Sequence, residues 1–281
     1  MHVCRFRDRY SFLTRTEAFL ARAEVENNMF LSLGGRPGAA ARVLGDDAYL
    51  AAVEHDGEVV GCAVRTPPYK VIITRAESSV LACLIEDLAA AEPDLPSVFG
   101  PEPSVTEFAR LWADRRGRAL RRGMRQRLFE ARTVMPLTRR PTGSLRAACT
   151  ADQDILAVWS AAFTADAHLT IQTEPLHEIR RRVAEGSLFV WDDARPVSMA
   201  AWAGRTSRGV RVNFVYTPPE HRHRGYASAC VADLSQRLLD EGQSFCCLYA
   251  DLDNPTSNKI YQAIGYQLVC DASDFHFSAL P

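Results

Sequence analysis

The residues that most clearly suggest a chemical role lie in a short loop and at the start of the predicted helix that follows it. Arg222, Gly225 and Ala227 come after the apolar stretch 210–216 and a Pro-Pro turn, and an apolar stripe at three- and four-residue steps continues to Leu238. The first N–H groups of a helix have no acceptor inside it, and the helix dipole adds partial positive charge there. Glycine and a small alanine let a charged group approach the backbone. The pattern therefore predicts an anion site suited to a diphosphate.

A second group of polar and aromatic residues follows further along the chain. The segment 254–266 reads Asn-Pro-Thr-Ser-Asn-Lys-Ile-Tyr-Gln-Ala-Ile-Gly-Tyr and carries Tyr261 within a predicted helix. A tyrosine hydroxyl, with a usual pKa of about 10, is protonated at neutral pH and can donate its proton to a leaving group. The alternative is a core tyrosine whose hydroxyl reaches the surface.

The two groups, in this order, resemble the signatures of the GNAT acetyltransferase superfamily. Arg222, Gly225 and Ala227 fit its R-x-x-G-x-A coenzyme A loop, and the order Asn254, Ser257, Tyr261, Gly265, Tyr266 is similar to its second signature. The resemblance implies a mixed α/β fold and an N-acetyltransferase that moves an acetyl group from acetyl-CoA to a primary amine by direct attack. It also implies that Tyr261 is the general acid.

In that superfamily the strand before the loop and the strand after its helix splay apart, and the pantetheine arm lies between them. The resemblance thus implies backbone contacts to this arm, diphosphate contacts from the loop, and a residue that ties the second strand to its helix. The residues in these three roles are Val215, Tyr216 and Thr217; Arg222, His223, Arg224, Gly225, Tyr226, Ala227 and Ser228; and Asn254.

The sequence assigns no general base. Asn213 stands on the strand where many members carry a carboxylate, and an amide cannot accept a proton at neutral pH. A water chain, or an amine that loses its proton in solution, would serve. The titratable residues in neighbouring segments have no distinguishing spacing; they are Glu174, His177, His168, Glu220, His221 and Asp251. A route through Cys246 or Cys247, which point to opposite faces of a strand, is the minor alternative.

Length and composition predict two domains. The chain has 281 residues, of which 47% are hydrophobic, and the linker-like stretch 136–143 divides it near the middle. We expect a degenerate GNAT-like domain at 1–138, because the turn 74–78 lacks the glycine of the phosphate loop, and a competent domain at 139–281. At the end of the second domain the pattern predicts two separate strands, 266–270 and 275–277.

Charge and cysteine usage exclude several classes. With 33 basic and 34 acidic residues the net charge is −1, so no global field attracts nucleic acid or a membrane surface. The arginine-rich stretch 115–127 is interpreted as a solvated helix end and strand edge, or else as a contact for an acidic substrate or phosphate. No apolar run approaches the length needed to cross a bilayer. The eight cysteines show no metal-ligand spacing, so we expect no metal and a cytoplasmic location.

Three functions are compatible with the sequence. The chain transfers the acetyl group to a small-molecule amine, it transfers it to a protein amine, or it is a non-catalytic acyl-CoA binder that serves as a scaffold. Acceptor identity depends on segments that vary freely within one fold. The oligomeric state is not encoded in any pattern of this sequence.

Overall fold

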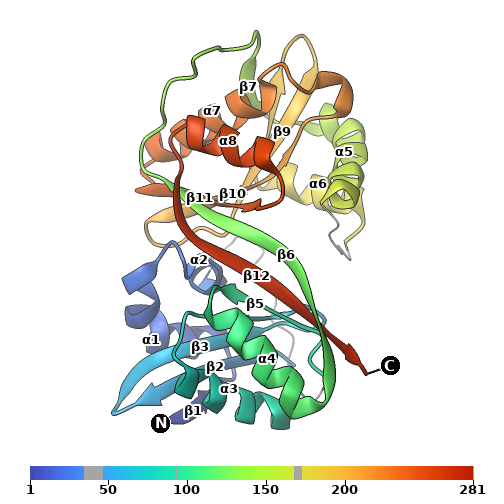
Figure 1. Cartoon of the computed structure of the whole chain (residues 1–281). Coiled ribbons are helices and arrows are strands. Elements are labelled where there is room, and N and C mark those ends of the chain that lie inside the picture. Colours follow the sequence, from blue (N-terminus) through green and yellow to red (C-terminus); the bar gives the residue numbers. More distant parts are fainter. Residues whose placement is uncertain (35–46, 93, 168–172, 281) are drawn as a thin grey trace. The chain divides into compact units, whose positions relative to one another are not determined.

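The computed structural model describes residues 1–34, 47–92, 94–167 and 173–280, which form two compact units (Figure 1). Unit 1 contains Met1–Leu128, Ala250–Asn254 and Leu268–Pro281. Unit 2 contains Phe129–Tyr249 and Pro255–Gln267. Each unit is a mixed sheet with helices packed on it.

In unit 1 a sheet carries helices on both faces. Its strands, in order across the sheet, are β1 (His2–Arg5), β2 (Tyr49–His55), β3 (Glu58–Arg65), β4 (Val71–Ile73), β5 (Ser97–Pro101), β12 (Gln267–Ala279) and β6 (Arg118–Ala131). Its helices are α1 (Arg9–Leu20), α2 (Asn28–Leu31), α3 (Ser78–Ala91) and α4 (Ser104–Arg116).

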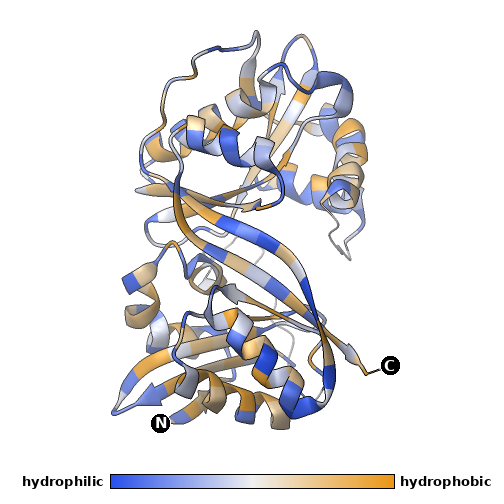
Figure 2. Ribbon diagram, viewed as in Figure 1, coloured by the Kyte–Doolittle hydropathy of each residue, from blue (hydrophilic) through white to orange (hydrophobic). Residues whose placement is uncertain are grey.

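Alternation along β2 shows how this sheet is covered. Ala51 and Val53 share a buried cluster with Leu84 of α3. Leu50 and the intervening Ala52 belong to a second buried cluster, with Phe12 of α1. Successive side chains of a strand point to opposite faces, so α1 packs on one face and α3 on the other. Figure 2 shows α4 with both hydrophobic and hydrophilic residues along its length, as expected of a helix with one buried side.

Unit 2 repeats this layered arrangement. Its strand order is β6, which contributes from residue 129, then β11 (Phe245–Asp251), β10 (Gly209–Tyr216), β9 (Pro196–Ala203), β8 (Leu188–Asp192) and β7 (Ser144–Ala147). Its helices are α5 (Gln153–Asp166), α6 (Pro175–Ala184), α7 (Tyr226–Asp240) and α8 (Pro255–Ala263). Trp159 of α5 and Ile179 of α6 pack on Met199 of β9, and α7 buries its apolar stripe, with Leu234 fully enclosed.

The two halves of the chain have one order of elements. The first runs β1-α1-α2-β2-β3-β4-α3-β5-α4-β6 and the second β7-α5-α6-β8-β9-β10-α7-β11-α8-β12. The corresponding strand pairs also agree, since β1/β2 and β7/β8 are antiparallel while β4/β5 and β10/β11 are parallel. Two tandem copies of one α/β fold, predicted from the sequence, are therefore present.

The last strand of the chain completes the first unit. β12 pairs antiparallel with β5, from Ala272 opposite Pro101 to His276 opposite Ser97. It is one strand and not the predicted two. The compact units therefore cross the predicted boundary between residues 138 and 139, because a strand is assigned by the ladder it joins and not by its place in the sequence. As the junction between two copies of the fold, that boundary stays a prediction.

The arginine-rich stretch is the end of α4 and most of β6, and several of its charges are paired. Within unit 1, Arg122 lies 3.5 Å from Glu102 and Arg125 2.7 Å from Asp253. Arg127 and Arg118 have acidic partners as well, in Asp271 and Asp94. Exposed, paired charges fit the interpretation as a solvated surface. The predicted strand edge is wrong, because β6 lies between β12 and β11 in the strand order. Among the described helices, none combines the length and hydrophobicity needed to cross a membrane.

We expect residues 139–281, expressed alone, to fail to fold. That fragment leaves β12 without β5 and lacks Phe129, whose ring lies 6.4 Å from that of Tyr261. An unpaired strand edge promotes aggregation. Size-exclusion chromatography and near-ultraviolet circular dichroism should show aggregated or loosely packed protein, and co-expression with residues 1–138 should restore a soluble pair. A monomeric fragment that unfolds cooperatively would contradict this expectation.

Candidate functional site

Strands β10 and β11 form a parallel ladder that is shorter than the strands themselves. The register runs from Gly209 opposite Phe245 to Arg211 opposite Cys247, and it extends no further among the described residues. Both strands continue beyond this point. Their facing edges thus have backbone N–H and C=O groups that the other strand does not pair, and an extended ligand arm can use such groups as a further strand would.

A β-bulge interrupts β10 just past the paired part. The register with β9 shifts between Asn213 and Tyr216, and Phe214 has a φ of 57°, in the left-handed region. A bulky residue adopts this conformation only where its surroundings impose it, and such positions cluster at functional sites. Ser198 of β9 holds the backbone after the bulge. Its hydroxyl donates to the carbonyl oxygen of Tyr216 at 3.1 Å and lies 2.8 Å from Thr217 Oγ1.

The residues predicted to pair with the coenzyme arm, Val215, Tyr216 and Thr217, lie at and after this bulge. The carbonyl oxygens of Tyr216 and Thr217 already accept protein donors, from Ser198 and Arg222. A carbonyl oxygen has two lone pairs, so each retains capacity for one more hydrogen bond. The pairing with the coenzyme stays a prediction.

Arg222 fixes the loop that follows β10. Its Nε donates to the carbonyl oxygen of Thr217 at 2.9 Å, and its Nη2 pairs with Asp166 of α5 at 2.8 Å. The guanidinium that we expected on a phosphate is therefore engaged with its own loop and with α5, and a phosphate contact from it stays a prediction. Arg224 is exposed and acts electrostatically on Asp193.

Helix α7 begins at Tyr226, directly after Gly225. The first hydrogen bond within the helix joins the Ala229 N–H to the Gly225 carbonyl oxygen at 3.0 Å. The amides of Tyr226, Ala227 and Ser228 thus have no acceptor inside the helix, and its first turn carries no acidic residue. This is the geometry of an anion site at a helix N-terminus.

The backbone ahead of α7 is arranged to leave that end open. His223 and Gly225 have φ values of 62° and 84°. A Cβ placed on Gly225 would approach only Pro141, at 3.8 Å, so on the protein side the space before the helix is free. The side chain of Tyr226 is not available to a ligand, because its hydroxyl donates to Asp193 at 2.6 Å and this bond raises the pKa of the phenol. Tyr226 can contribute its amide only.

Tyr261 lies on α8 and is 8% exposed. Its ring packs on those of Phe129 and Tyr266, with centroids 6.4 and 6.0 Å away, and within the described part of the chain its hydroxyl makes no hydrogen bond. Burial raises the pKa of Tyr261 to about 12, so the phenol keeps its proton at neutral pH. Asn254 stands at the predicted place before α8, its amide donating to the Asp251 carbonyl oxygen at 3.2 Å.

The candidate bases divide by environment. The carboxylate of Glu174 caps α6 by accepting the amides of Leu176 and His177, which lowers its pKa and makes it a poor base. Two buried atoms, His221 Nδ1 and Asn213 Oδ1, have no hydrogen-bond partner among the described residues. The remaining candidates are His177 and Glu220, both exposed, Asp251, which belongs to unit 1, and His168, which lies outside the described residues.

Cys246 is not suited to covalent catalysis. It is fully buried, its Sγ lies 3.7 Å from the carbonyl oxygen of Ser235 on α7, and burial raises its pKa to about 12. The thiolate is the nucleophilic form, and it is scarce at neutral pH when the pKa is this high. A route through this cysteine is therefore disfavoured.

The equivalent place in unit 1 is closed. A Cβ on Gly100 of β5 would lie 2.7 Å from the Ile73 side chain and 3.0 Å from its carbonyl oxygen, so β4 and β5 remain in close contact at their ends. Ahead of α3, the Ser104 hydroxyl accepts the Ala76 N–H at 3.0 Å and donates to the Ala76 carbonyl oxygen at 2.9 Å. The first copy of the fold is degenerate at the level of structure as well as of sequence.

Comparisons with known proteins agree with this architecture. Residues 190–275 match a family model described as FR47-like protein, and a search of curated proteins with the sequence found no match. An acetyltransferase of the GNAT family from Colwellia psychrerythraea is 12% identical, with 99% of this chain and 100% of that chain covered and a TM-score of 0.59. A GCN5-related N-acetyltransferase from Sphaerobacter thermophilus is 16% identical, with 98% and 95% covered and a TM-score of 0.60.

A tandem GNAT protein from the clavulanic acid biosynthesis pathway shares the two-copy arrangement. It is 14% identical, with 99% of this chain and 98% of that chain covered and a TM-score of 0.58. Identities this low show a common fold and carry no substrate over. They show that the chain has the tandem GNAT fold, and the FR47-like match lies in the half of the chain that carries the two sequence motifs. Membership of the GNAT superfamily itself stays a prediction, since that match covers less than half of the chain.

We expect Gly225→Val to abolish coenzyme binding while leaving unit 2 folded. Valine at a φ of 84° strains the backbone, and its side chain would occupy the space before α7. Titration calorimetry with coenzyme A should show affinity lowered roughly 100-fold or more, as expected when charge-assisted hydrogen bonds are lost.

Gly242→Val is the matched control for this substitution. Gly242 follows the other end of α7 with a φ of 97° and no atom near a Cβ, so valine there brings similar strain at a distance from the loop. Both variants should unfold at similar temperatures, and only Gly225→Val should lose binding. Equal affinities in the two variants would show that the diphosphate binds elsewhere.

Proposed function

We propose that unit 2 is an acetyl-CoA-dependent N-acetyltransferase that moves the acetyl group to a primary amine by direct attack. The observation that carries the proposal is the end of the β10–β11 ladder at Arg211 and Cys247, next to the open N-terminus of α7. An extended arm beside a strand edge and a diphosphate at a helix N-terminus are the two parts of coenzyme A that such a site suits.

The residues before α7 would hold the diphosphate. The amides of residues 226–228 donate to phosphate oxygens, and the left-handed backbone at His223 and Gly225 directs the loop so that no side chain covers them. Arg222 keeps the loop in this shape through Thr217 and Asp166. Arg224, exposed in the same loop, supplies positive charge.

Tyr261 would assist departure of the thiolate. When the amine nitrogen bonds to the carbonyl carbon, the C–S bond breaks and the sulfur takes its electron pair. The protonated phenol donates a hydrogen bond to that sulfur. Because a free thiol has a pKa of about 8.5, below that of buried Tyr261, the proton lost by the amine is needed to complete the transfer, directly or through water.

Asn213 suits an acceptor that brings hydrogen-bond donors. Its Oδ1 is buried without a partner in the described part of the chain, and an unsatisfied buried acceptor gains from an N–H group of a substrate. An amide oxygen orients an amine without taking its proton. The amine therefore reaches the site neutral, or loses its proton to water.

The lack of an assigned carboxylate base also supports a second candidate, a non-catalytic acyl-CoA binder that acts as a scaffold. If the chain is an enzyme, we propose that its acceptor is a small-molecule amine or a protein amine.

The proposed location is cytoplasmic. The eight cysteines are all free, which suits a reducing compartment.

Calorimetric titration with acetyl-CoA, desulfo-CoA and adenosine diphosphate, followed by a thiol-release assay over a panel of amines and lysine peptides, tests the proposed function. One site per chain with a contribution from the pantetheine arm, and thiol release with at least one amine, would establish the transferase. Binding without turnover on any amine would favour the scaffold. No binding would reject both.

We expect Tyr261→Phe to lower turnover roughly 10²–10³-fold, the usual cost of one hydrogen-bond donor to a developing charge. The fold should be unaffected, since the hydroxyl makes no hydrogen bond in the described part of the chain. Turnover is measured on an amine found in the panel, and stability by thermal unfolding.

Tyr266→Phe gives the opposite pattern and serves as the control. The Tyr266 hydroxyl lies 2.7 Å from Ser235 Oγ in a buried pair, so its loss should cost about 1 kcal/mol of stability and leave turnover near the wild-type value. If Tyr261→Phe turns over at the wild-type rate, the hydroxyl of Tyr261 is not the donor.

A further inference from the structure

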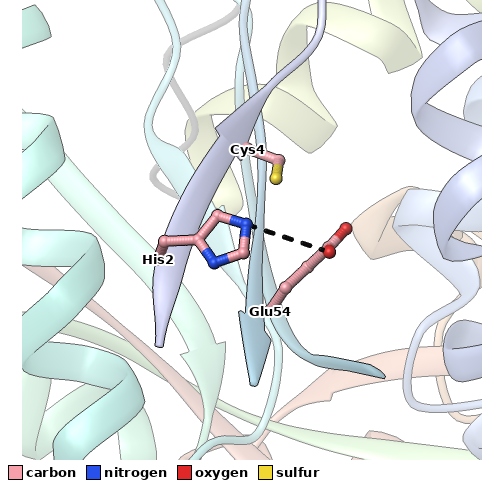
Figure 3. A group of neighbouring side chains, drawn as sticks. All are labelled: His2, Cys4 and Glu54. Atoms are coloured by element: carbon pink, nitrogen blue, oxygen red, sulfur yellow. Dashed lines mark ion pairs between the residues drawn. The ribbon is translucent and has the colours of Figure 1, made fainter. Parts of the chain in front are cut away.

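Three side chains of different chemistry converge where the first strand meets the second. His2 and Cys4 are two residues apart on β1 and so share one face, and in the antiparallel register His2 lies opposite Glu54 of β2 while Cys4 lies opposite Ala52. Figure 3 shows the imidazole, the thiol and the carboxylate pointing into the same space. One ligand atom from each lies within 4.8 Å of the others.

These groups are a metal-ligand set. Imidazole nitrogen, thiolate sulfur and carboxylate oxygen are the three donors that Zn²⁺ takes from proteins, and three protein ligands leave a fourth position for water. We propose that His2, Cys4 and Glu54 bind a divalent cation of the Zn²⁺ class, which would fasten β1 to β2 in unit 1.

The carboxylate of Glu54 is already oriented for this role. Arg15 Nε donates to Oε1 at 2.7 Å, while Oε2 faces His2 Nε2 at 4.0 Å. Arg15 is itself held by a hydrogen bond from Nη2 to the Gly57 carbonyl oxygen at 2.6 Å. A ligating carboxylate commonly has its other oxygen bound by a neighbouring donor, so one oxygen remains for the metal.

The distances allow the three atoms to close on an ion. Tetrahedral bonds of 2.0–2.3 Å place ligand atoms about 3.3–3.8 Å apart, so the present spacings, all within 4.8 Å, must contract by about 1.5 Å at most. His2 can make most of this movement, because its side chain is 66% exposed. On binding, the Cys4 sulfur gives up its proton to the buffer and donates an electron pair to the cation.

The net charge at the site favours retention of the ion. A thiolate and a carboxylate neutralise a divalent cation, and the imidazole adds a neutral donor. With the Arg15 guanidinium included, the group carries a net charge of about +1. This charge borders solvent and is already paired with Glu54. β1 is the terminal strand in the order of unit 1 and has only four residues, so a cross-strand tie would add to a short ladder.

The test uses the full chain without an added histidine tag, freed of metal by a chelator and titrated with Co²⁺. Thiolate ligation gives a sulfur-to-Co²⁺ charge-transfer band in the near ultraviolet, and tetrahedral geometry gives intense visible bands. We expect one equivalent of Co²⁺ to produce both, Zn²⁺ to displace it, and Zn²⁺ to raise the melting temperature of the wild type.

Matched variants identify the ligands. Cys4→Ser should remove the charge-transfer band, and His2→Gln should weaken Co²⁺ binding at least tenfold. Cys149→Ser and His55→Gln should leave the band and the Co²⁺ affinity unchanged. Cys149 is an exposed free thiol and His55 an exposed histidine next to Glu54, so they report adventitious binding. Persistence of the band in Cys4→Ser, its loss in Cys149→Ser, or the absence of stoichiometric binding would overturn the proposal. Circular dichroism of each variant shows whether the fold is kept.

Discussion

The early end of one parallel ladder is the constraint on which the candidate site depends. After Arg211 and Cys247, β10 and β11 no longer pair, and the left-handed backbone of Phe214 turns β10 so that its edge stays free. Unpaired backbone groups are costly when buried, so a protein keeps them only where a ligand or water satisfies them. The roles proposed for the loop, the start of α7 and Tyr261 on α8 all depend on a ligand arm lying along this edge.

Unit 1 has the same topology, but its two corresponding strands stay in contact at their ends. Its β4 and β5 remain in contact, with Ile73 against Gly100, and Ser104 occupies the backbone groups of Ala76 that a ligand would otherwise use. A few local contacts, and no change in the order of elements, thus separate the copy with the proposed coenzyme site from the copy without it. The fold is shared between the units, and the proposed site belongs to one of them.

Much of this architecture could be predicted because it rests on local patterns. The apolar stripe of α7, the Pro-Pro turn before it and the glycine at position 225 each require particular residues at fixed spacing. The bulge at Phe214 could not be predicted, since its conformation is imposed by tertiary contacts around it. The engagement of Arg222 with Asp166 also has no local signal, because those residues are far apart in sequence.

The placement of β12 follows from the same distinction. Its pairing with β5 joins segments that are far apart in the sequence, and the periodicity of either segment does not indicate which ladder it joins. A strand that completes the other copy makes each copy depend on the whole chain for its edges, since Phe129 at the end of β6 in turn packs on Tyr261 in unit 2. Truncation of the chain at the predicted boundary between residues 138 and 139 would therefore remove Phe129, a packing partner of the proposed acid, and would separate β12 from β5. The predicted domain boundary thus divides residues that the packing holds together.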